Sequence, residues 1–253
     1  MLIAHPSSAR VVLITGAGRR VGAATARRLH RNGWQVLLHC FHSLRTATAL
    51  AEELNAIRPD SARVLIANLN QTEDVQALAA ASLNAYGRVD ALVNNASAFY
   101  PTPIGLTTQN QWDDLFASNA RAPFFLSQAL TPALQASGRG CMVNVIDIHA
   151  DYPLAEHTVY CMAKAALAAM TKSLAKELAP SVRVNGVAPG AIAWPEGSGE
   201  MSAELQDSIL RSVPLGRVGG FDSIADTITF LIDGTDYISG QIIAVDGGRS
   251  VWG

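Results

Sequence analysis

The chain has 253 residues, of which 49% are hydrophobic and 16% charged, so it can bury the core of a full α/β domain. A formal net charge of −2 provides no basic footprint, which argues against nucleic acid and anionic membranes as partners. No apolar run approaches the ~18 residues of a membrane span, and residues 1–10 lack the pattern of a secretion signal. We therefore expect a cytoplasmic protein.

The cysteines and histidines do not form a recognisable metal-binding pattern. Cys40, Cys141 and Cys161 contain no Cys-x-x-Cys pair, and the six histidines show no His-Glu-x-x-His spacing. The sequence therefore predicts no metal site.

Short β-branched runs alternate with longer segments of helical period along the whole chain. Buried parallel strands are predicted at Val11 to Thr15, Trp34 to His39, Arg63 to Ala67, Val89 to Asn94, Met142 to Ile146, Val182 to Ala188 and Gln241 to Val245. Helices are predicted at Val21 to Asn32, Arg45 to Ile57, Thr72 to Tyr86, Gln111 to Ala136, Thr158 to Leu178 and Phe221 to Ile232. This alternation predicts an α/β fold: a single-domain, doubly wound parallel sheet of the Rossmann type with helices on both faces.

One stretch interrupts this order. The segment Trp194 to Pro214 is rich in Gly, Ser and Glu near its start and is long for a connection. It is predicted to contain a short mobile helix that acts as a lid over the site.

The first strand runs directly into a glycine-rich turn, Thr15 to Gly22, and then into a helix. Glycines let the backbone approach a phosphate, and the helix N-terminus supplies free N–H groups. Arg19 and Arg20 add positive charge in the same turn. These features predict a dinucleotide site.

The end of the second strand indicates which dinucleotide. NAD enzymes usually place an acid there to hold the ribose hydroxyls. Here the chain reads His39-Cys40-Phe41-His42-Ser43-Leu44-Arg45, which contains no acid but offers donors and a cation to a 2′-phosphate. NADPH is therefore the predicted cofactor, with ordinary loop histidines as the alternative reading.

A tyrosine and a lysine four residues apart, Tyr160 and Lys164, lie on the same face of a predicted helix. The ammonium group is expected to lower the pKa of the phenol, which makes the tyrosine a usable acid or base beside a hydride donor. Asp147 precedes Tyr160 by thirteen residues, and this spacing favours a role in the site.

Taken together, these residues resemble the short-chain dehydrogenase/reductase superfamily over essentially the whole chain. The matches follow the family's order: the Thr-Gly turn, Asn68-Leu69, Asn94-Asn95-Ala96, Asn119, Tyr160 with Lys164, Pro189-Gly190 and Asp246-Gly247-Gly248. The resemblance implies that Tyr160 donates a proton, that Lys164 holds the nicotinamide ribose, and that Asn119 supports a water relay. It also implies a homotetramer built on the helices Gln111 to Ala136 and Thr158 to Leu178.

Departures from the general pattern resemble the pteridine reductases. Arg20 replaces the middle glycine of the turn, Ser97 replaces the glycine after Asn-Asn-Ala, and Asp147 replaces the usual serine. The run Asn94 to Pro103 also resembles that family's substrate loop. A flat pterin could stack on Phe99, and reduction of its C=N bond needs a proton at nitrogen, which Asp147 and Tyr160 would handle.

The sequence therefore predicts an NADPH-dependent pteridine reductase that converts dihydropterins, such as dihydrobiopterin and also dihydrofolate, to tetrahydropterins. The alternatives are a carbonyl reductase acting on, for instance, a 3-oxoacyl thioester, and a non-catalytic NADPH-binding or sensor protein. The predicted catalytic residues are Asp147, Tyr160, Lys164 and Asn119. Cofactor binding is predicted for Gly16, Arg19, Arg20, Val21, His39, Phe41, His42, Ser43, Asn68, Leu69, Asn95, Ala96, Ser97, Tyr160, Lys164, Pro189 and Gly190. Substrate binding is predicted for Arg20, Ser97, Phe99, Asp147, Tyr160 and Trp194.

Overall fold

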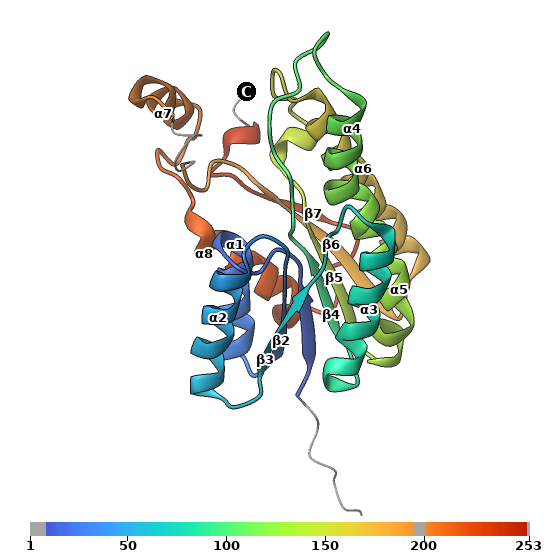
Figure 1. The fold of residues 1–253 in the computed structure, drawn as a ribbon. Helices are drawn as coiled ribbons and strands as arrows, with labels where there is room; N and C mark the ends of the chain where they lie inside the picture. The colour runs from blue at the N-terminus through green and yellow to red at the C-terminus, as the bar shows by residue number, and fades with distance from the viewer. Residues whose placement is uncertain (1–8, 195–200, 252–253) are drawn as a thin grey trace, which may run out of the picture.

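A computed structural model describes residues 9–194 and 201–251, which form a seven-stranded sheet between two layers of helices (Figure 1). Every neighbouring pair of strands is parallel, and their order is β3-β2-β1-β4-β5-β6-β7. The predicted doubly wound, Rossmann-like fold is therefore confirmed. The strands are β1 (Val11–Ile14), β2 (Gln35–Cys40), β3 (Ala62–Ile66), β4 (Ala91–Asn94), β5 (Gly140–Val145), β6 (Val182–Pro189) and β7 (Ile242–Val245).

The helices are divided between the two faces of the sheet. In Figure 1, α1, α2 and α8 lie on one side, and α3, α5 and α6 lie with α4 on the other. The helices are α1 (Arg20–Arg31), α2 (Leu44–Ile57), α3 (Thr72–Tyr86), α4 (Gln109–Phe116), α5 (Ala122–Ala136), α6 (Thr158–Glu177), α7 (Ala203–Arg211) and α8 (Gly220–Thr229). Within the described residues, no helix is long and apolar enough to cross a membrane.

The sheet divides the hydrophobic core into two large clusters. Successive side chains of a strand point to opposite faces, so Val12 and Ile14 of β1 pack with α1 and α8. Val11 and Leu13 pack with α3 and α5 on the other face. All four residues are fully buried, which explains why the first strand is apolar throughout instead of alternating.

Two of the strands predicted to be buried are partly exposed. β3 and β7 contain mostly half-buried residues, whereas β1, β4 and β5 are buried throughout. The reason is position, because β3 and β7 are the two edges of the sheet.

The predicted helix Gln111 to Ala136 is divided in the structure. It begins at Gln109, where Thr108 forms a capping box with Gln111, and a π-helical turn, Ala117–Arg121, separates α4 from α5. Such turns break the regular hydrogen-bond ladder and are frequent at functional sites. This one carries Asn119.

The last predicted helix and the irregular segment also differ in detail. α8 ends at Thr229 and continues as a second π-helical turn, Phe230–Gly234. The short helix expected between Trp194 and Pro214 is α7, which lies beyond the carboxyl end of the sheet (Figure 1). Residues 195–200 of that segment lie outside the described part of the chain.

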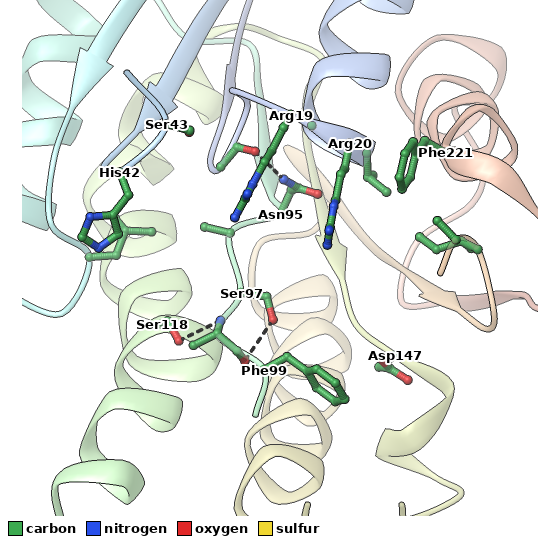
Figure 2. Close-up of a pocket in the computed structure, with 18 of the residues that line it drawn as sticks. Arg19, Arg20, His42, Ser43, Asn95, Ser97, Phe99, Ser118, Asp147 and Phe221 are labelled. Carbon is green, nitrogen blue, oxygen red and sulfur yellow. Dashed lines mark hydrogen bonds between the residues drawn. The ribbon is translucent and has the colours of Figure 1, made fainter. Parts of the chain in front are cut away.

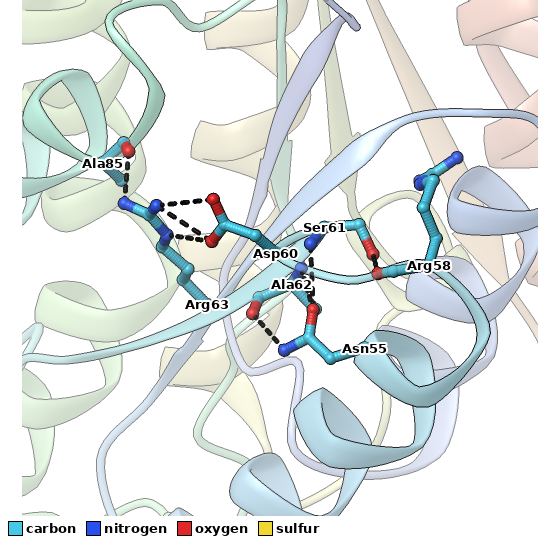
Figure 3. Close-up of polar contacts among 7 residues, drawn as sticks. All are labelled: Asn55, Arg58, Asp60, Ser61, Ala62, Arg63 and Ala85. Carbon is cyan, nitrogen blue, oxygen red and sulfur yellow. Dashed lines mark hydrogen bonds and ion pairs between the residues drawn. The ribbon is translucent and has the colours of Figure 1, made fainter.

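The turn between α2 and β3 lies at the amino end of the sheet and is built from polar contacts (Figure 3). The Asn55 side chain accepts hydrogen bonds from the backbone N–H groups of Ser61 and Ala62, both at 2.9 Å, and donates to the Ala62 carbonyl at 2.8 Å. Asp60 pairs with Arg63 at 2.9 Å. This turn is structural and lies at the end of the sheet opposite to the carboxyl end, where the strand order reverses between β1 and β4.

Candidate functional site

A cavity of about 850 Å³ lies at the carboxyl end of the sheet. It is where the strand order reverses between β1 and β4, the usual ligand position in an open α/β sheet. The segments after each of the first six strands contribute to its wall. The predicted residues that line it are Gly16, Arg19, Arg20, Val21, His39, Phe41, His42, Ser43, Asn68, Leu69, Asn95, Ala96, Ser97, Phe99, Asp147, Gly190 and Trp194.

The glycine-rich turn packs tightly against the segment after β4. Gly16 adopts a φ of +63°, and a Cβ there would lie 3.0 Å from the Ala96 Cα. The Asn95 side chain donates to the carbonyls of Thr15 at 2.8 Å and Gly16 at 3.1 Å, while the Thr15 hydroxyl accepts from the Asn95 N–H at 2.9 Å. These contacts hold the start of α1 at the cavity, where a phosphate can meet its free N–H groups.

Arg19 and Arg20 extend side by side into the cavity (Figure 2). Within residues 9–194 and 201–251, neither guanidinium has an ion-pair partner. His42 and Ser43 line the same cavity from the end of β2. The glycine turn therefore offers two cations to a phosphate, and the end of β2 offers an imidazole and a hydroxyl. Arg45, the cation expected after β2, is not part of the cavity wall.

His39 lies in the cavity wall, but its ring is not available to a phosphate. Its Nδ1 accepts a hydrogen bond from the Gly16 N–H at 3.2 Å, and Nε2 faces the Ala67 carbonyl at 3.1 Å. Burial lowers the pKa of His39, so the neutral ring with a proton on Nε2 is favoured. Both ring nitrogens are therefore occupied, one by Gly16 of the glycine turn and the other by Ala67 after β3, so the ring has no free donor for the 2′-phosphate that the sequence assigned to it.

The predicted catalytic tyrosine and aspartate are in direct contact. The Tyr160 hydroxyl donates to Asp147 Oδ2 at 2.8 Å, and Asp147 Oδ1 accepts from the His149 N–H at 2.9 Å. Asp147 follows β5 and caps a short 3₁₀ turn, Ile148–Ala150, whereas Tyr160 lies near the start of α6. The spacing of thirteen residues thus brings together an acid and a phenol that occupy different elements.

The expectation that Lys164 would lower the pKa of Tyr160 is not met. Burial raises the pKa of Tyr160 well above its usual value, and the negative charge of Asp147 raises it further. Lys164 lies with its Nζ 5.7 Å from the Tyr160 ring centre and donates instead to the Val145 carbonyl at 2.9 Å. Burial lowers the pKa of Lys164 to about 8. Tyr160 therefore keeps its proton but is a weaker acid than the sequence analysis expected.

Asn119 positions the loop after β4 and does not line the cavity itself. This fully buried residue accepts from the Ser97 hydroxyl at 2.7 Å and donates to the Ala98 carbonyl at 2.9 Å. The Tyr100 hydroxyl donates to Asp114 Oδ2 at 2.7 Å. The loop is thus tied to α4 and the π-helical turn at Ser97, Ala98 and Tyr100. A water relay through Asn119 stays a prediction.

Phe99 lies between these ties and points toward the cavity (Figure 2). The residue is 53% exposed. It stacks on the His157 ring with centroids 4.7 Å apart, and it meets the Tyr160 ring edge to face at 4.8 Å. His157 supports one face of Phe99, and the exposed part of the residue can contact a flat ligand.

Several cavity residues are not among the site residues predicted from the sequence. His149 and Leu154 come from the segment between Asp147 and Tyr160, whereas Phe221 and Arg249 come from the start of α8 and the turn after β7. Conversely, the predicted residues Pro189, Tyr160 and Lys164 are buried and are not part of the wall. The further lining residues are Gly22, Cys40, Asn70, Ala98, Asp114, Ser118, His149, Leu154, Ala191, Ile192, Ala193, Met201, Ile209, Phe221 and Arg249.

A family model and several known proteins each match nearly the full chain. A family model described as enoyl-(acyl carrier protein) reductase matches residues 16–250. Pteridine reductase 1 of Leishmania tarentolae is 37% identical over 96% of this chain and 97% of that protein. The 3-oxoacyl-(acyl-carrier-protein) reductase FabG of Staphylococcus aureus is 33% identical over 93% of this chain and 96% of that protein. Its counterpart in Staphylococcus epidermidis is 32% identical over 93% and 97%, respectively.

Proposed function

Because the chain belongs to the short-chain dehydrogenase/reductase family of oxidoreductases, we propose that it is an NADPH-dependent pteridine reductase. Its substrate is a dihydropterin, such as dihydrobiopterin and also dihydrofolate, which it converts to the tetrahydro form. The observation that carries this proposal is the hydrogen bond of 2.8 Å between Tyr160 and Asp147 at the cavity. The similarity to pteridine reductase 1 of Leishmania tarentolae supports it.

The cavity wall fits a dinucleotide. The absence of a side chain at Gly16 lets the turn pack against Ala96 and positions the start of α1 at the cavity, where Arg19 and Arg20 supply charge for a phosphate. Enzymes of this family use NAD(P)(H). The wall after β2 contains His42 and Ser43 and no acid, which favours a cofactor with a 2′-phosphate. When bound, NADPH supplies the hydride.

Tyr160 and Asp147 supply the proton. Reduction of the C=N bond of a 7,8-dihydropterin adds a hydride at carbon and a proton at the ring nitrogen. Burial and the Asp147 charge keep Tyr160 protonated, so its hydroxyl can donate when a nitrogen base approaches. The proton that leaves the pair is replaced from solvent, and the product is the tetrahydropterin.

Phe99 holds the flat ring of the substrate. Its exposed face lies across the same part of the cavity as Asp147 (Figure 2), and Arg20 reaches in from the glycine turn. Stacking fixes the plane of the pterin, and a guanidinium can bind its carbonyl edge. We assign Lys164 to the nicotinamide ribose and Asn119 to a water relay, as the family resemblance implies.

Three further features are part of the same proposal. Trp194, Met201 and Ile209 line the cavity from the predicted lid segment, which supports a role of that segment as a lid over the substrate end. A homotetramer and a cytoplasmic location complete the proposed description and stay predictions.

A carbonyl reductase is the second candidate, because the FabG proteins of two Staphylococcus species are also similar over nearly the whole chain. That reaction needs a hydroxyl to polarise a ketone oxygen. Asp147 is less suited to it, because a carboxylate repels the negative charge that develops on that oxygen.

The test is NADPH oxidation followed by absorbance, with 7,8-dihydrobiopterin and an acetoacetyl thioester as substrates. We expect saturable turnover of the pterin and a loss of about 100-fold in kcat/KM for Asp147→Ser, the scale of general acid catalysis. Asp151→Ser removes an exposed acid of the same loop and should behave as the unmodified protein. NADPH binding without pterin turnover would overturn the proposal. An Asp147→Ser variant that gains thioester reduction would favour the carbonyl alternative.

A further inference from the structure

His149 is a polar cavity residue that the proposed reaction does not use. It follows Asp147 by two residues, on the 3₁₀ turn Ile148–Ala150, and its half-buried side chain lines the cavity. Its backbone N–H is bound to Asp147 Oδ1 at 2.9 Å. His149 and Asp147 therefore line the same cavity from one short turn.

The hydrogen bonds of His149 define what its ring presents. Nδ1 lies 2.7 Å from the Tyr152 carbonyl. Because a carbonyl oxygen only accepts, Nδ1 carries a proton and donates it. Within the described residues, Nε2 has no hydrogen-bond partner. The ring is thus held in place by Nδ1, and Nε2 is left to interact with a ligand in the cavity that His149 lines.

The geometry of the substrate places its side chain near this nitrogen. In a 7,8-dihydropterin the carbon that receives the hydride, C6, is bonded to the nitrogen that receives the proton and also carries the ring's substituent. A substituent on that carbon must lie next to the group that protonates the nitrogen. His149 is the polar side chain bonded through its backbone to that group, whereas Leu154, Met201 and Ile209 provide apolar surface in the same wall.

We propose that His149 selects dihydropterins with a hydroxylated C6 side chain by accepting a hydrogen bond from a side-chain hydroxyl at Nε2. This inference rests on the proposed pterin reductase activity and specifies its substrate class. An alkyl substituent on the same carbon leaves Nε2 without a hydrogen-bond partner in a partly desolvated site. The missing hydrogen bond lowers the affinity for that substrate.

Two variants separate this role from a structural one. In His149→Asn the amide can replace Nδ1 and keep the bond to Tyr152, but nothing reaches the position of Nε2. In His149→Gln the longer amide places a polar group at the position of Nε2. Asp151→Ser again serves as the control on the same loop.

The measurement is the ratio of kcat/KM for 7,8-dihydrobiopterin, which has two side-chain hydroxyls, to that for 6-methyl-7,8-dihydropterin, which has none. We expect His149→Asn to lower this ratio about three- to tenfold, the effect of one hydrogen bond. We expect His149→Gln to keep most of this ratio. In His149→Asn the lower ratio should come from a higher KM for 7,8-dihydrobiopterin more than from a lower kcat.

The outcomes distinguish the two proposals. If the unmodified protein reduces neither dihydropterin, the pterin reductase assignment has failed. If it reduces both and His149→Asn leaves the ratio unchanged, only the role of His149 is overturned. An equal loss on both substrates in both variants would also overturn it, because a purely structural histidine has that effect.

Discussion

Arg20 combines an unfavourable backbone with a favourable position. Its φ of +53° lies in the left-handed region, where a side chain costs about 1 kcal/mol relative to glycine. The residue opens α1 and its guanidinium extends into the cavity. A strained residue at a binding site indicates that its side chain has a functional role, which explains why the loss of stability is tolerated.

We therefore predict opposite effects of Arg20→Gly on stability and binding. The glycine relieves the backbone, so the free energy of unfolding should rise by up to about 1 kcal/mol, while NADPH or pterin affinity falls about tenfold through loss of a charge-assisted contact. Arg20→Ala should lose the same affinity without the gain in stability. Thermal unfolding measures the change in stability, and fluorescence titration measures the change in affinity. Equal melting temperatures for the two variants would show that the backbone is not strained.

At the scale of elements, the loop after β4 is preorganised by its attachment to α4 and the π-helical turn. Tyr100 donates to Asp114 Oδ2, and Asn70 donates to Asp114 Oδ1 at 2.6 Å. Burial, with the Asp114 charge, raises the pKa of Tyr100 to about 12, so this hydroxyl remains a donor. Together with the bonds of Ser97 and Ala98 to Asn119, the bond of Tyr100 fixes the loop on either side of Phe99.

Tyr100→Phe should therefore loosen Phe99 without touching the reacting groups. We predict a several-fold higher KM for the pterin, a smaller change in kcat, and a loss of about 1 kcal/mol in the free energy of unfolding, as expected for one hydrogen bond. Steady-state kinetics and urea titration measure these. Tyr152→Phe, at an exposed tyrosine, is the control. A kcat loss as large as that of an Asp147 variant would contradict a positioning role.

At the scale of the whole molecule, two buried histidines make folding depend on pH. His30 on α1 faces the Ser61 hydroxyl at 2.7 Å, near the turn of Figure 3, and His39 supports the glycine turn at the other end of the sheet. Burial lowers the pKa of each below its ordinary value of 6.5. As the pH falls below about 6.5, the unfolded chain takes up protons that the folded chain excludes, so stability falls.

We predict that the free energy of unfolding decreases as the pH is lowered from 7 toward 5, the range in which unfolded histidines become protonated. His30→Gln should make the dependence shallower, because an amide does not titrate there and can still reach Ser61. Urea titrations at several pH values test this, with the exposed His42→Gln as control. A stability that is flat over this range would contradict the account.

Local patterns predicted much of the fold and part of the site. Each predicted strand and helix has a counterpart, because the periodicity of apolar residues directly reflects burial on one face or two. The glycine turn and the Asp147 to Tyr160 spacing were also readable, since each depends on residues close in sequence. The ends of elements and the π-helical turn around Asn119 were not, because they depend on packing between helices.

Contacts between distant segments decided the rest. Sequence alone indicated a family fold, a dinucleotide turn and an acid beside the tyrosine. Only the tertiary structure showed that both His39 nitrogens are occupied, that His157 supports Phe99, and that Phe221 and Arg249 reach the cavity. It also decided that Tyr160 keeps its proton, because the pKa of a side chain depends on burial and neighbouring charges that no linear pattern records.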